Sequence, residues 1–211
     1  CGSPVFVGYL GIFASKLMNI ESSQWVQDIW PEAIQTTKGL KNKKIINVIN
    51  FLQNQMWKYS DILFSESDLL TKYLKNKFPY KKIKTLYNPV RKKEISSIIS
   101  NRKNKNKLMF SYTGNIGGAQ NLDKILEAFS DLNQDKFELH MCGDGPLFSE
   151  FKIKFNQKNI FWHGWLSGKD LDDIYVNSDF FILSLNSEGR QSLILPSKLQ
   201  TYFQLKRPIF C

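Results

Sequence analysis

The second half of the chain alternates short apolar stretches with amphipathic ones. Strand-like stretches occur at residues 108–112, 137–142, 159–163, 180–185 and 208–211. Helical patterns lie between them, at residues 121–131, 147–155, 169–176 and 197–205. Strands that recur at intervals of roughly 20–30 residues with a helix in each interval are typical of βαβ units and a parallel sheet. This half therefore predicts an α/β fold.

The first half repeats this pattern less completely. Helices are expected at Tyr9–Met18, Ile45–Tyr59 and Ser67–Leu74, and strands at Gln24–Asp28, Asp61–Phe64 and Lys84–Tyr87. The stretch Ser96–Lys107 is polar and charged, which is typical of a linker. We predict two doubly wound, Rossmann-like domains, at residues 1–100 and 101–211. The first lacks opening strands and the second ends on a strand, so we expect a piece of a longer protein.

Positive charge is concentrated in the first half of the chain. The formal net charge is +10, from 29 Lys and Arg against 19 Asp and Glu. Residues 1–106 carry a net charge of +11 and residues 107–211 a net charge of −1. This asymmetry indicates an anionic partner, although a Lys-rich coding bias gives the same pattern. Lys outnumbers Arg 25 to 4, which disfavours nucleic acid, because base readout favours Arg.

Three loops in the second half are suited to binding phosphate. Thr113–Ala119 and Cys142–Pro146 are glycine-rich and each follows a predicted strand, and Pro196–Lys198 opens a helix. Ligands of such sheets bind at the carboxyl ends of the strands, where helix N-termini attract anions. A lysine in the first turn of a helix is unfavourable unless an anion lies there, so Lys198 is either a phosphate ligand or an exposed surface residue. Together the loops favour a nucleoside diphosphate.

The sequence resembles a known family of enzymes. The runs YTGNIGGAQNLDKILEAF (112–129), HMCGDGPLFSEF (140–151), FWHGWLSGKDLDDIYVNSDFFILSL (161–185) and PSKLQTYFQLKRPIF (196–210) resemble the nucleotide-sugar half of GT-B glycosyltransferases. They are similar to the retaining bacterial enzymes that build capsule, O-antigen and exopolysaccharide units, in a colanic-acid and fucosaminyltransferase-like subgroup. WVQDIWPEAI (25–34), SES (65–67) and LYNPV (86–90) resemble the later part of the acceptor domain.

The resemblance implies a set of residues that bind the donor. They are Gly114, Asn115, Gly117, Gly118, Gln120, Gly143, Gly145, Arg190, Ser197, Lys198 and Thr201. Many relatives have Arg and Lys where this chain has Asn115 and Gln120, so Lys198 and Arg190 would supply the positive charge. Relatives also have two Glu eight positions apart, and this chain has Leu193 and Thr201 there. Thr201 would then hydrogen-bond the donor ribose, with Glu188 as an upstream candidate.

Two features of the first half concern the acceptor. Asp28 ends a predicted strand, and it either positions or deprotonates an acceptor hydroxyl or caps the turn before Pro31. Lys38–Lys44 is a basic stretch that would attract anionic lipid headgroups, or is a solvated loop. In the second half, His140 and His163 fall in apolar stretches, and we interpret them as core or near-core residues rather than metal ligands.

We therefore expect a cytoplasmic glycosyltransferase, peripheral at the inner face of the cell membrane. It would transfer a sugar from a nucleotide-sugar donor, with UDP as the expected nucleotide, to a lipid-diphosphate-linked saccharide. Lys198 would stabilise the leaving diphosphate and Asp28 would act on the acceptor. The resemblance implies a retaining reaction without metal or added cofactor. The alternative is a catalytically impaired GT-B relative that serves as a binding or scaffold subunit, because Asn115, Gln120 and Thr201 replace charged residues.

Overall fold

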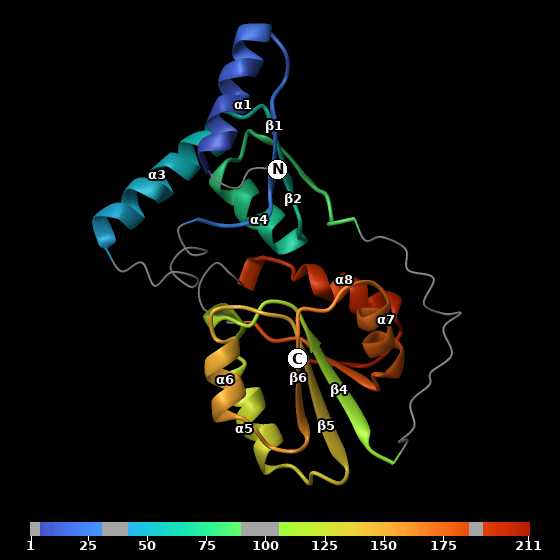
Figure 1. Cartoon of the computed structure of the whole chain (residues 1–211). Coiled ribbons are helices and arrows are strands. Elements are labelled where there is room, and N and C mark those ends of the chain that lie inside the picture. Colours follow the sequence, from blue (N-terminus) through green and yellow to red (C-terminus); the bar gives the residue numbers. More distant parts are fainter. Residues whose placement is uncertain (1–4, 31–41, 90–105, 186–191) are drawn as a thin grey trace. The chain divides into compact units, whose positions relative to one another are not determined.

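The computed structural model describes residues 5–30, 42–89, 106–185 and 192–211 (Figure 1). The chain forms two compact units. The first consists of residues 1–89 and 187–195, and the second of residues 90–186 and 196–211. The predicted linker up to residue 105, Lys38, Glu188 and Arg190 lie outside the described residues.

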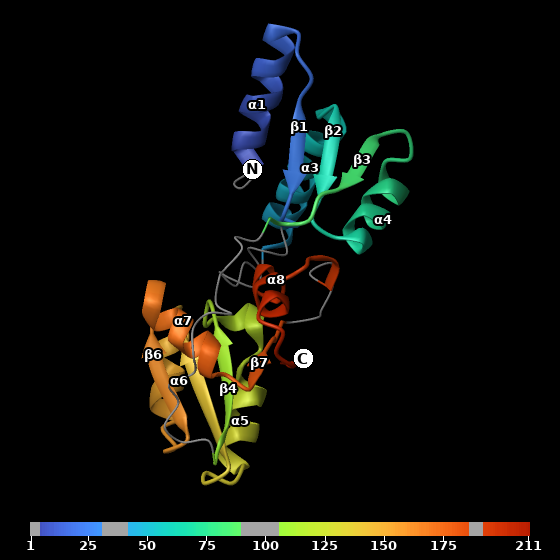
Figure 2. The same ribbon diagram turned by 90° about the vertical axis from the view of Figure 1, so that its right-hand side faces the viewer.

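The first unit contains a parallel sheet with helices between its strands (Figure 2). In chain order its elements are α1 (Val5–Met18), β1 (Ser23–Val26), α3 (Lys43–Tyr59), β2 (Ile62–Ser65), α4 (Asp68–Lys77) and β3 (Lys82–Thr85). The described strands pair in the order β1-β2-β3, with Ser23 opposite Ile62 and Ile62 opposite Lys82. The carboxyl ends of all three strands therefore lie at one edge of the sheet.

The helices of the first unit begin where the sequence offers capping side chains. The Asn42 side chain accepts hydrogen bonds from the backbone N–H groups of Lys44 and Ile45 at the start of α3. Ser67 caps α4 by accepting from Leu70 N–H at 3.0 Å. Apolar side chains of α3, α4 and the sheet then form one core: Val26, Ile29, Met56, Trp57, Leu63, Leu70, Leu74 and Ile83.

The second unit is a larger parallel sheet with helices on both faces. Its elements are β4 (Leu108–Thr113), η2 (Gly118–Gln120), α5 (Asp123–Asp131), β5 (Phe137–Cys142), α6 (Phe148–Lys154), β6 (Ile160–Gly164), α7 (Gly168–Asn177), β7 (Phe180–Ile182), α8 (Ser197–Gln204) and β8 (Ile209–Phe210). The described strands are ordered β6-β5-β4-β7-β8. The chain first moves outward from β4 to β6 and then returns to β7 on the other side. The chain thus changes direction across the sheet between β4 and β7. Such sheets bind ligands at this switch point, which lies beside the carboxyl end of β4.

The α/β fold with parallel sheets is confirmed, and several strand boundaries need correction. β7 covers Phe180–Ile182 instead of the predicted 180–185. β1 ends at Val26, so Asp28 lies two residues beyond the strand. β3 covers Lys82–Thr85 instead of the predicted Lys84–Tyr87. The apolar side chains that suggested the later boundary, Leu86 and Tyr87, are exposed, and the Tyr87 hydroxyl donates to Asp68 at 2.7 Å. No helix in the described parts of the chain is both long enough and apolar enough to cross a membrane.

Candidate functional site

Two glycine loops of the second unit pack backbone against backbone at the carboxyl ends of β4 and β5. Gly114 N–H donates to Cys142 O at 2.8 Å, and Ile116 N–H donates to Asp144 O at 2.9 Å. Gly143 and Gly145 both have positive φ, and a Cβ on either would overlap a carbonyl oxygen of the first loop. Only glycine fits so close an approach. The two loops therefore form one layer of backbone at the switch point.

Lys198 reaches this layer from the first turn of α8. Its Nζ donates to the Tyr112 hydroxyl at 2.7 Å and lies 4.0 Å from the centre of the Tyr112 ring. The hydroxyl in turn donates to Asn115 O at 2.6 Å. A Cβ on Gly114 would come within 2.9 Å of the Lys198 Nζ, so glycine leaves room for the ammonium. Lys198 is therefore held at the loop and is not the freely exposed lysine of the alternative interpretation.

Burial alters the protonation of this pair. Desolvation lowers the pKa of Lys198 to about 8, because the surrounding protein disfavours the charged ammonium. Desolvation also raises the pKa of Tyr112 well above its ordinary value, so its hydroxyl stays protonated. An anion bound beside Lys198 would raise the pKa of Lys198 again, because it favours the charged ammonium.

The structure places the remaining predicted donor residues as follows. Gln120 Oε1 accepts from Gly117 N–H at 3.1 Å and from Asn115 Nδ2 at 3.2 Å, so these polar side chains brace the loop. Gly118 begins η2. Ser197 is exposed at the start of α8, where no side chain caps the helix, and Thr201 follows one turn later. Arg190 lies outside the described residues.

Sequence reasoning missed the residue that holds α8 against β4. Tyr202 is fully buried, and its ring stacks on Phe181 with centroids 4.4 Å apart. Its hydroxyl lies 3.1 Å from Thr113 N, from which it accepts, and 3.0 Å from Thr113 Oγ1. This contact fixes the helix that carries Lys198 to the end of the strand that carries Tyr112. An apolar pattern in the helix predicts burial of Tyr202 but not this partner.

A second group of polar residues lies at the carboxyl edge of the first unit. Asp28 is exposed, and desolvation of its carboxyl group raises its pKa. Its backbone is held by the buried Gln53, whose Nε2 donates to Asp28 O at 3.4 Å and whose Oε1 accepts from Trp30 N–H at 3.1 Å. Asp28 is thus accessible and has a supported backbone.

Glu66 is a buried carboxyl group near Asp28. It is 2% exposed, and its Oε2 accepts from Asn88 Nδ2 at 2.7 Å. Asn88 Oδ1 accepts from Gln27 Nε2 at 2.9 Å, which ties the ends of β1, β2 and β3 together. Glu66 Oε1 is buried, and the backbone of Leu195 contacts the Glu66 carboxyl group. Desolvation raises the pKa of Glu66 to about 7; the Asp28 charge adds to this effect, and the Asn88 and Leu195 contacts oppose it. Sequence reasoning did not predict that Glu66 is a buried carboxyl group with a raised pKa.

The two histidines lie side by side on one face of the second sheet. His140 Nδ1 and His163 Nε2 are 2.9 Å apart, and the rings stack with centroids 5.0 Å apart. His163 is exposed, which corrects its interpretation as a core or near-core residue. The pairing follows from the parallel register of β5 and β6, which the sequence does not specify. The described part of the chain contains no group of three or more His, Cys, Asp or Glu suited to a metal ion.

Comparison with known proteins identifies the type of fold. Residues 94–190 match the profile of the family described as glycosyl transferases group 1. The structure is similar to the apo form of the lipopolysaccharide outer core galactosyltransferase WaaB, at 16% identity and a TM-score of 0.63, covering 97% of this chain and 53% of that one. It is similar to Anabaena Alr3699/HepE in complex with UDP-glucose, at 10% identity and a TM-score of 0.67, covering 97% of this chain and 57% of that one.

A third similar structure is the pneumococcal O-GlcNAc transferase GtfA in complex with UDP and GlcNAc. The identity is 14% and the TM-score 0.60, with 96% of this chain and 39% of that one covered. No curated protein sequence matches the chain significantly. The chain spans about half the length of the first solved structures that it matches. The matched segment is thus similar to the glycosyl transferases group 1 profile, and the chain has the α/β fold with parallel sheets of these GT-B structures. The fucosaminyltransferase-like subgroup stays a prediction.

Proposed function

We propose that this chain is part of a glycosyltransferase that moves a sugar from a UDP-sugar to a lipid-diphosphate-linked saccharide. The observation that carries the proposal is Lys198, held by the Tyr112 hydroxyl at 2.7 Å against the glycine loops at the switch point. A desolvated cation in the first turn of α8, whose N-terminus no side chain caps, is suited to a diphosphate leaving group. The solved structure of Alr3699/HepE is a complex with UDP-glucose and that of GtfA a complex with UDP and GlcNAc, which supports the same nucleotide here.

The reaction proposed for this site breaks the bond between the sugar and the diphosphate. Negative charge develops on the departing oxygen, and Lys198 with the uncapped N-terminus of α8 would stabilise it. No cofactor or metal ion is part of the proposal. The family resemblance implies retention of configuration, and we propose a front-face mechanism for it. In this mechanism the departing phosphate assists in removing the proton of the acceptor hydroxyl.

Asp28 is the residue that we propose to position or deprotonate the acceptor hydroxyl. It is accessible at the carboxyl edge of its sheet, and the buried Glu66 lies close enough for their charges to interact. When Glu66 is neutral, a charge on Asp28 costs less, because like charges repel in a medium of low dielectric constant. Glu66 is thus proposed to control how readily Asp28 carries its charge.

The affinity for UDP is expected to depend on pH through Lys198. Its pKa of about 8 means that the ammonium is present below this pH and is lost above it. Above about pH 8, UDP affinity should fall by roughly tenfold per pH unit, because the Lys198 amine must bind a proton before it can bind UDP. Calorimetric titration with UDP at several pH values measures this. A Lys198→Ala variant should bind weakly with no such decline. Absence of any UDP binding by the wild-type chain would reject the donor proposal.

The stability of the first unit is expected to fall between about pH 4.5 and pH 7. The pKa of Glu66 is about 7 in the folded chain and 4.5 as its ordinary value, so the folded state binds more protons over this range. The free energy of unfolding should therefore fall as pH rises through this window, by roughly 2–3 kcal/mol. Urea denaturation at pH 5 and pH 8 measures the difference.

Glu66→Gln removes the titrating group and keeps its shape, so the variant should lose most of this pH dependence. Glu150→Gln changes an exposed carboxylate on α6 and serves as the control, with the wild-type pH dependence retained. If the free energy of unfolding of Glu66→Gln changed with pH as in the wild type, Glu66 would have a pKa near its ordinary value.

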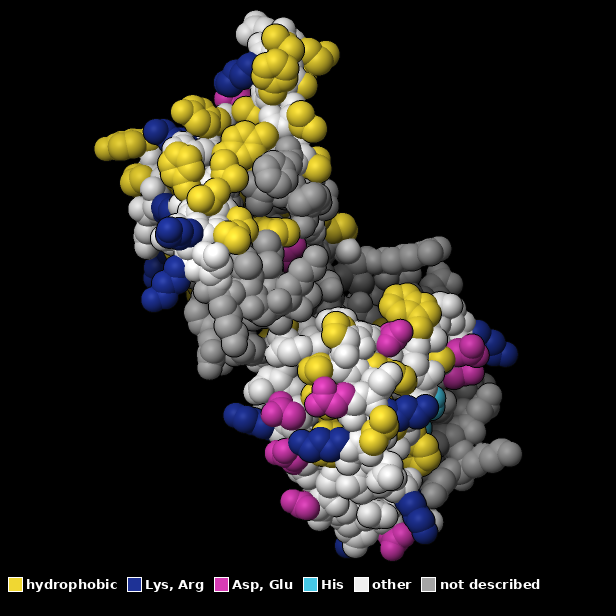
Figure 3. All heavy atoms as spheres, turned by 60° about the vertical axis from the view of Figure 1, so that its left-hand side comes forward, with side chains coloured by type: hydrophobic (Ala, Val, Ile, Leu, Met, Phe, Trp, Pro, Cys, Tyr) yellow, Lys and Arg dark blue, Asp and Glu magenta, His cyan; other side chains and the backbone are white. Residues whose placement is uncertain are grey.

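We further propose that the first unit lies against a membrane surface. Apolar side chains are exposed on its helices, among them Leu10, Phe13, Leu17, Val48 and Phe51. Figure 3 shows apolar and lysine side chains next to one another over these helices. Exposed apolar area beside positive charge is typical of proteins that bind anionic lipid. Flotation with anionic and zwitterionic vesicles tests this part of the proposal, which requires preference for the anionic ones.

The second candidate function is a binding or scaffold subunit that has lost transfer activity. The observation that favours it is the pairing of Asn115 with Gln120, whose side chains brace the loop and carry no charge toward a diphosphate. The two functions differ in turnover. UDP binding without release of UDP from UDP-sugars in the presence of lipid-linked acceptors would favour the scaffold.

A further inference from the structure

The first unit has a cavity at the amino ends of its strands, and Asp28 and Glu66 follow the opposite, carboxyl ends. This cavity of about 560 Å³ lies where β2 and β3 begin. It is lined by Lys58, Asp61, Lys77, Phe78, Pro79, Tyr80, Lys81 and Lys82. Its volume is in the range of sites for small ligands. The proposed acceptor residues follow the other ends of the strands, so this cavity has no part in the proposed transfer.

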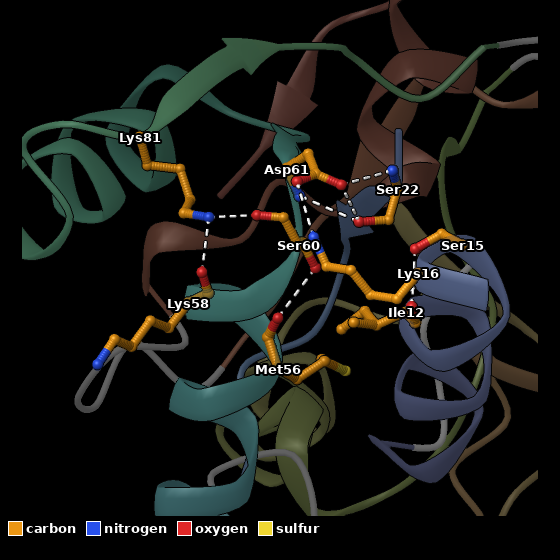
Figure 4. A network of polar contacts seen from close by, with 9 residues as sticks. All are labelled: Ile12, Ser15, Lys16, Ser22, Met56, Lys58, Ser60, Asp61 and Lys81. Carbon is orange, nitrogen blue, oxygen red and sulfur yellow. Dashed lines mark hydrogen bonds and ion pairs between the residues drawn. The ribbon is translucent and has the colours of Figure 1, made fainter. Parts of the chain in front are cut away.

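The charges around the cavity are unbalanced. Four of its lining residues are lysines and one is a carboxylate, Asp61. Asp61 already accepts from Ser22 N–H at 2.8 Å and from Ser22 Oγ at 2.6 Å, and Lys16 lies 3.5 Å away (Figure 4). The two Ser22 hydrogen bonds are the main cause of its low pKa of about 2. The negative charge of Asp61 acts on Lys81 but is shared with Ser22 and Lys16 outside the cavity, so this one carboxylate cannot neutralise four lysines.

Lys81 is held rigidly in the wall of this cavity. Its Nζ donates to Lys58 O at 2.8 Å and to Ser60 O, the carbonyl groups at the end of α3 (Figure 4). An ammonium group has three N–H donors, so one donor remains for a ligand. Because α3 ends at these carbonyls, its dipole stabilises the cation there. Lys81 is therefore a preformed positive group that needs no reorganisation to contact an anion.

Lys77 and Tyr80 provide further features of a binding wall. Lys77 Nζ donates to Tyr73 Oη at 3.2 Å and lies 5.5 Å from the Tyr73 ring centre and 5.7 Å from that of Trp57. Tyr80 is fully exposed at the rim. Four of the lining residues carry an ammonium group, and a ligand with two or more negative charges would balance them. Lysine suits phosphate as a compact point charge.

We propose that this cavity binds a phosphate-bearing ligand, either a soluble phosphate compound or the headgroup of an anionic phospholipid. Lys81 and Lys77 form the fixed part of the site, and Lys58 and Lys82 supply the outer charges. The site is separate from the donor loops of the second unit. It accounts for part of the positive charge of residues 1–106 that the proposed transfer reaction does not use.

The test compares two paired-lysine variants of the whole chain. Lys58→Gln/Lys82→Gln removes charge from the cavity and leaves the backbone carbonyl that Lys81 contacts. Lys72→Gln/Lys75→Gln removes the same charge from exposed positions on α4 outside it. The soluble probe is pyrophosphate, titrated by calorimetry into chains that also carry Lys198→Ala, so that the donor loops lack their proposed diphosphate ligand. The lipid probe is a vesicle of phosphatidic acid in phosphatidylcholine.

We expect the cavity variant to lose roughly tenfold or more in affinity for one of the two probes, and the α4 control to lose less than about twofold. Site-dependent binding of pyrophosphate alone identifies a soluble ligand, and site-dependent vesicle binding alone identifies a lipid. Equal losses in both variants mean diffuse charge attraction and overturn the proposal, as does the absence of binding to either probe. Matching circular dichroism spectra and thermal midpoints establish that both variants are folded.

Discussion

Replacement of Lys198 by alanine is expected to lower the affinity for UDP by about 30- to 1000-fold, measured by calorimetric titration at pH 7. The ammonium lies against the glycine loops and is held by Tyr112, so a bound diphosphate would face it in a desolvated site. Removal of one partner from a buried charge pair costs about 2–4 kcal/mol, because the other charge is left uncompensated. Activity with a UDP-sugar should fall at least as much, since charge on the diphosphate increases during transfer.

Two further variants separate this effect from a general loss of positive charge. Lys169→Ala removes an exposed lysine in the first turn of α7 and should change UDP affinity by less than about twofold. Tyr112→Phe keeps the ring under the ammonium and removes the hydroxyl, so its loss should be intermediate. UDP affinity in Lys198→Ala within twofold of wild type would rule out Lys198 as the diphosphate ligand.

The features that local sequence determines could be predicted. The apolar run that begins at Phe180 marks a buried strand, which ends at Ile182. A serine at 65 or 67 before an amphipathic stretch marks a helix start, and the structure uses Ser67. Glycines directly after two strands predicted the two glycine loops of the second unit. Glycine is required there because the backbones approach too closely to leave room for a Cβ. Each of these features depends on neighbours within a few residues, which is why periodicity and spacing were sufficient.

The contacts that define the site join residues distant in the chain and could not be predicted. Tyr112 and Lys198 are 86 positions apart, and Glu66 and Asn88 are 22 apart. Whether such side chains meet depends on strand order and register, which the pattern of apolar residues leaves open. The pKa of Glu66 follows from burial, which no local motif encodes. The candidate ligands on single loops were thus predicted, and their partners were not.

Replacement of Gly143 by alanine is expected to lower the free energy of unfolding by about 3–5 kcal/mol, measured by guanidinium denaturation. Gly143 has a φ of +148°, a region that residues with a Cβ rarely adopt, which alone costs about 1–3 kcal/mol. An added Cβ would also overlap the Gly114 carbonyl oxygen, and overpacking of this kind costs about 1–3 kcal/mol more. The two loops hydrogen-bond to each other, so neither can move away without breaking the contact of Gly114 N–H with Cys142 O.

The control for this variant separates backbone strain from overlap. Gly168 also has a positive φ, +57°, but an added Cβ there meets no atom within 4 Å, so Gly168→Ala should cost only about 1 kcal/mol. If Gly143→Ala folds, displacement of Gly114 should carry the loop away from Lys198 and weaken UDP binding, while Gly168→Ala keeps wild-type affinity. Equal losses of stability in the two variants would mean that the close approach of the two loops is not what requires glycine at 143.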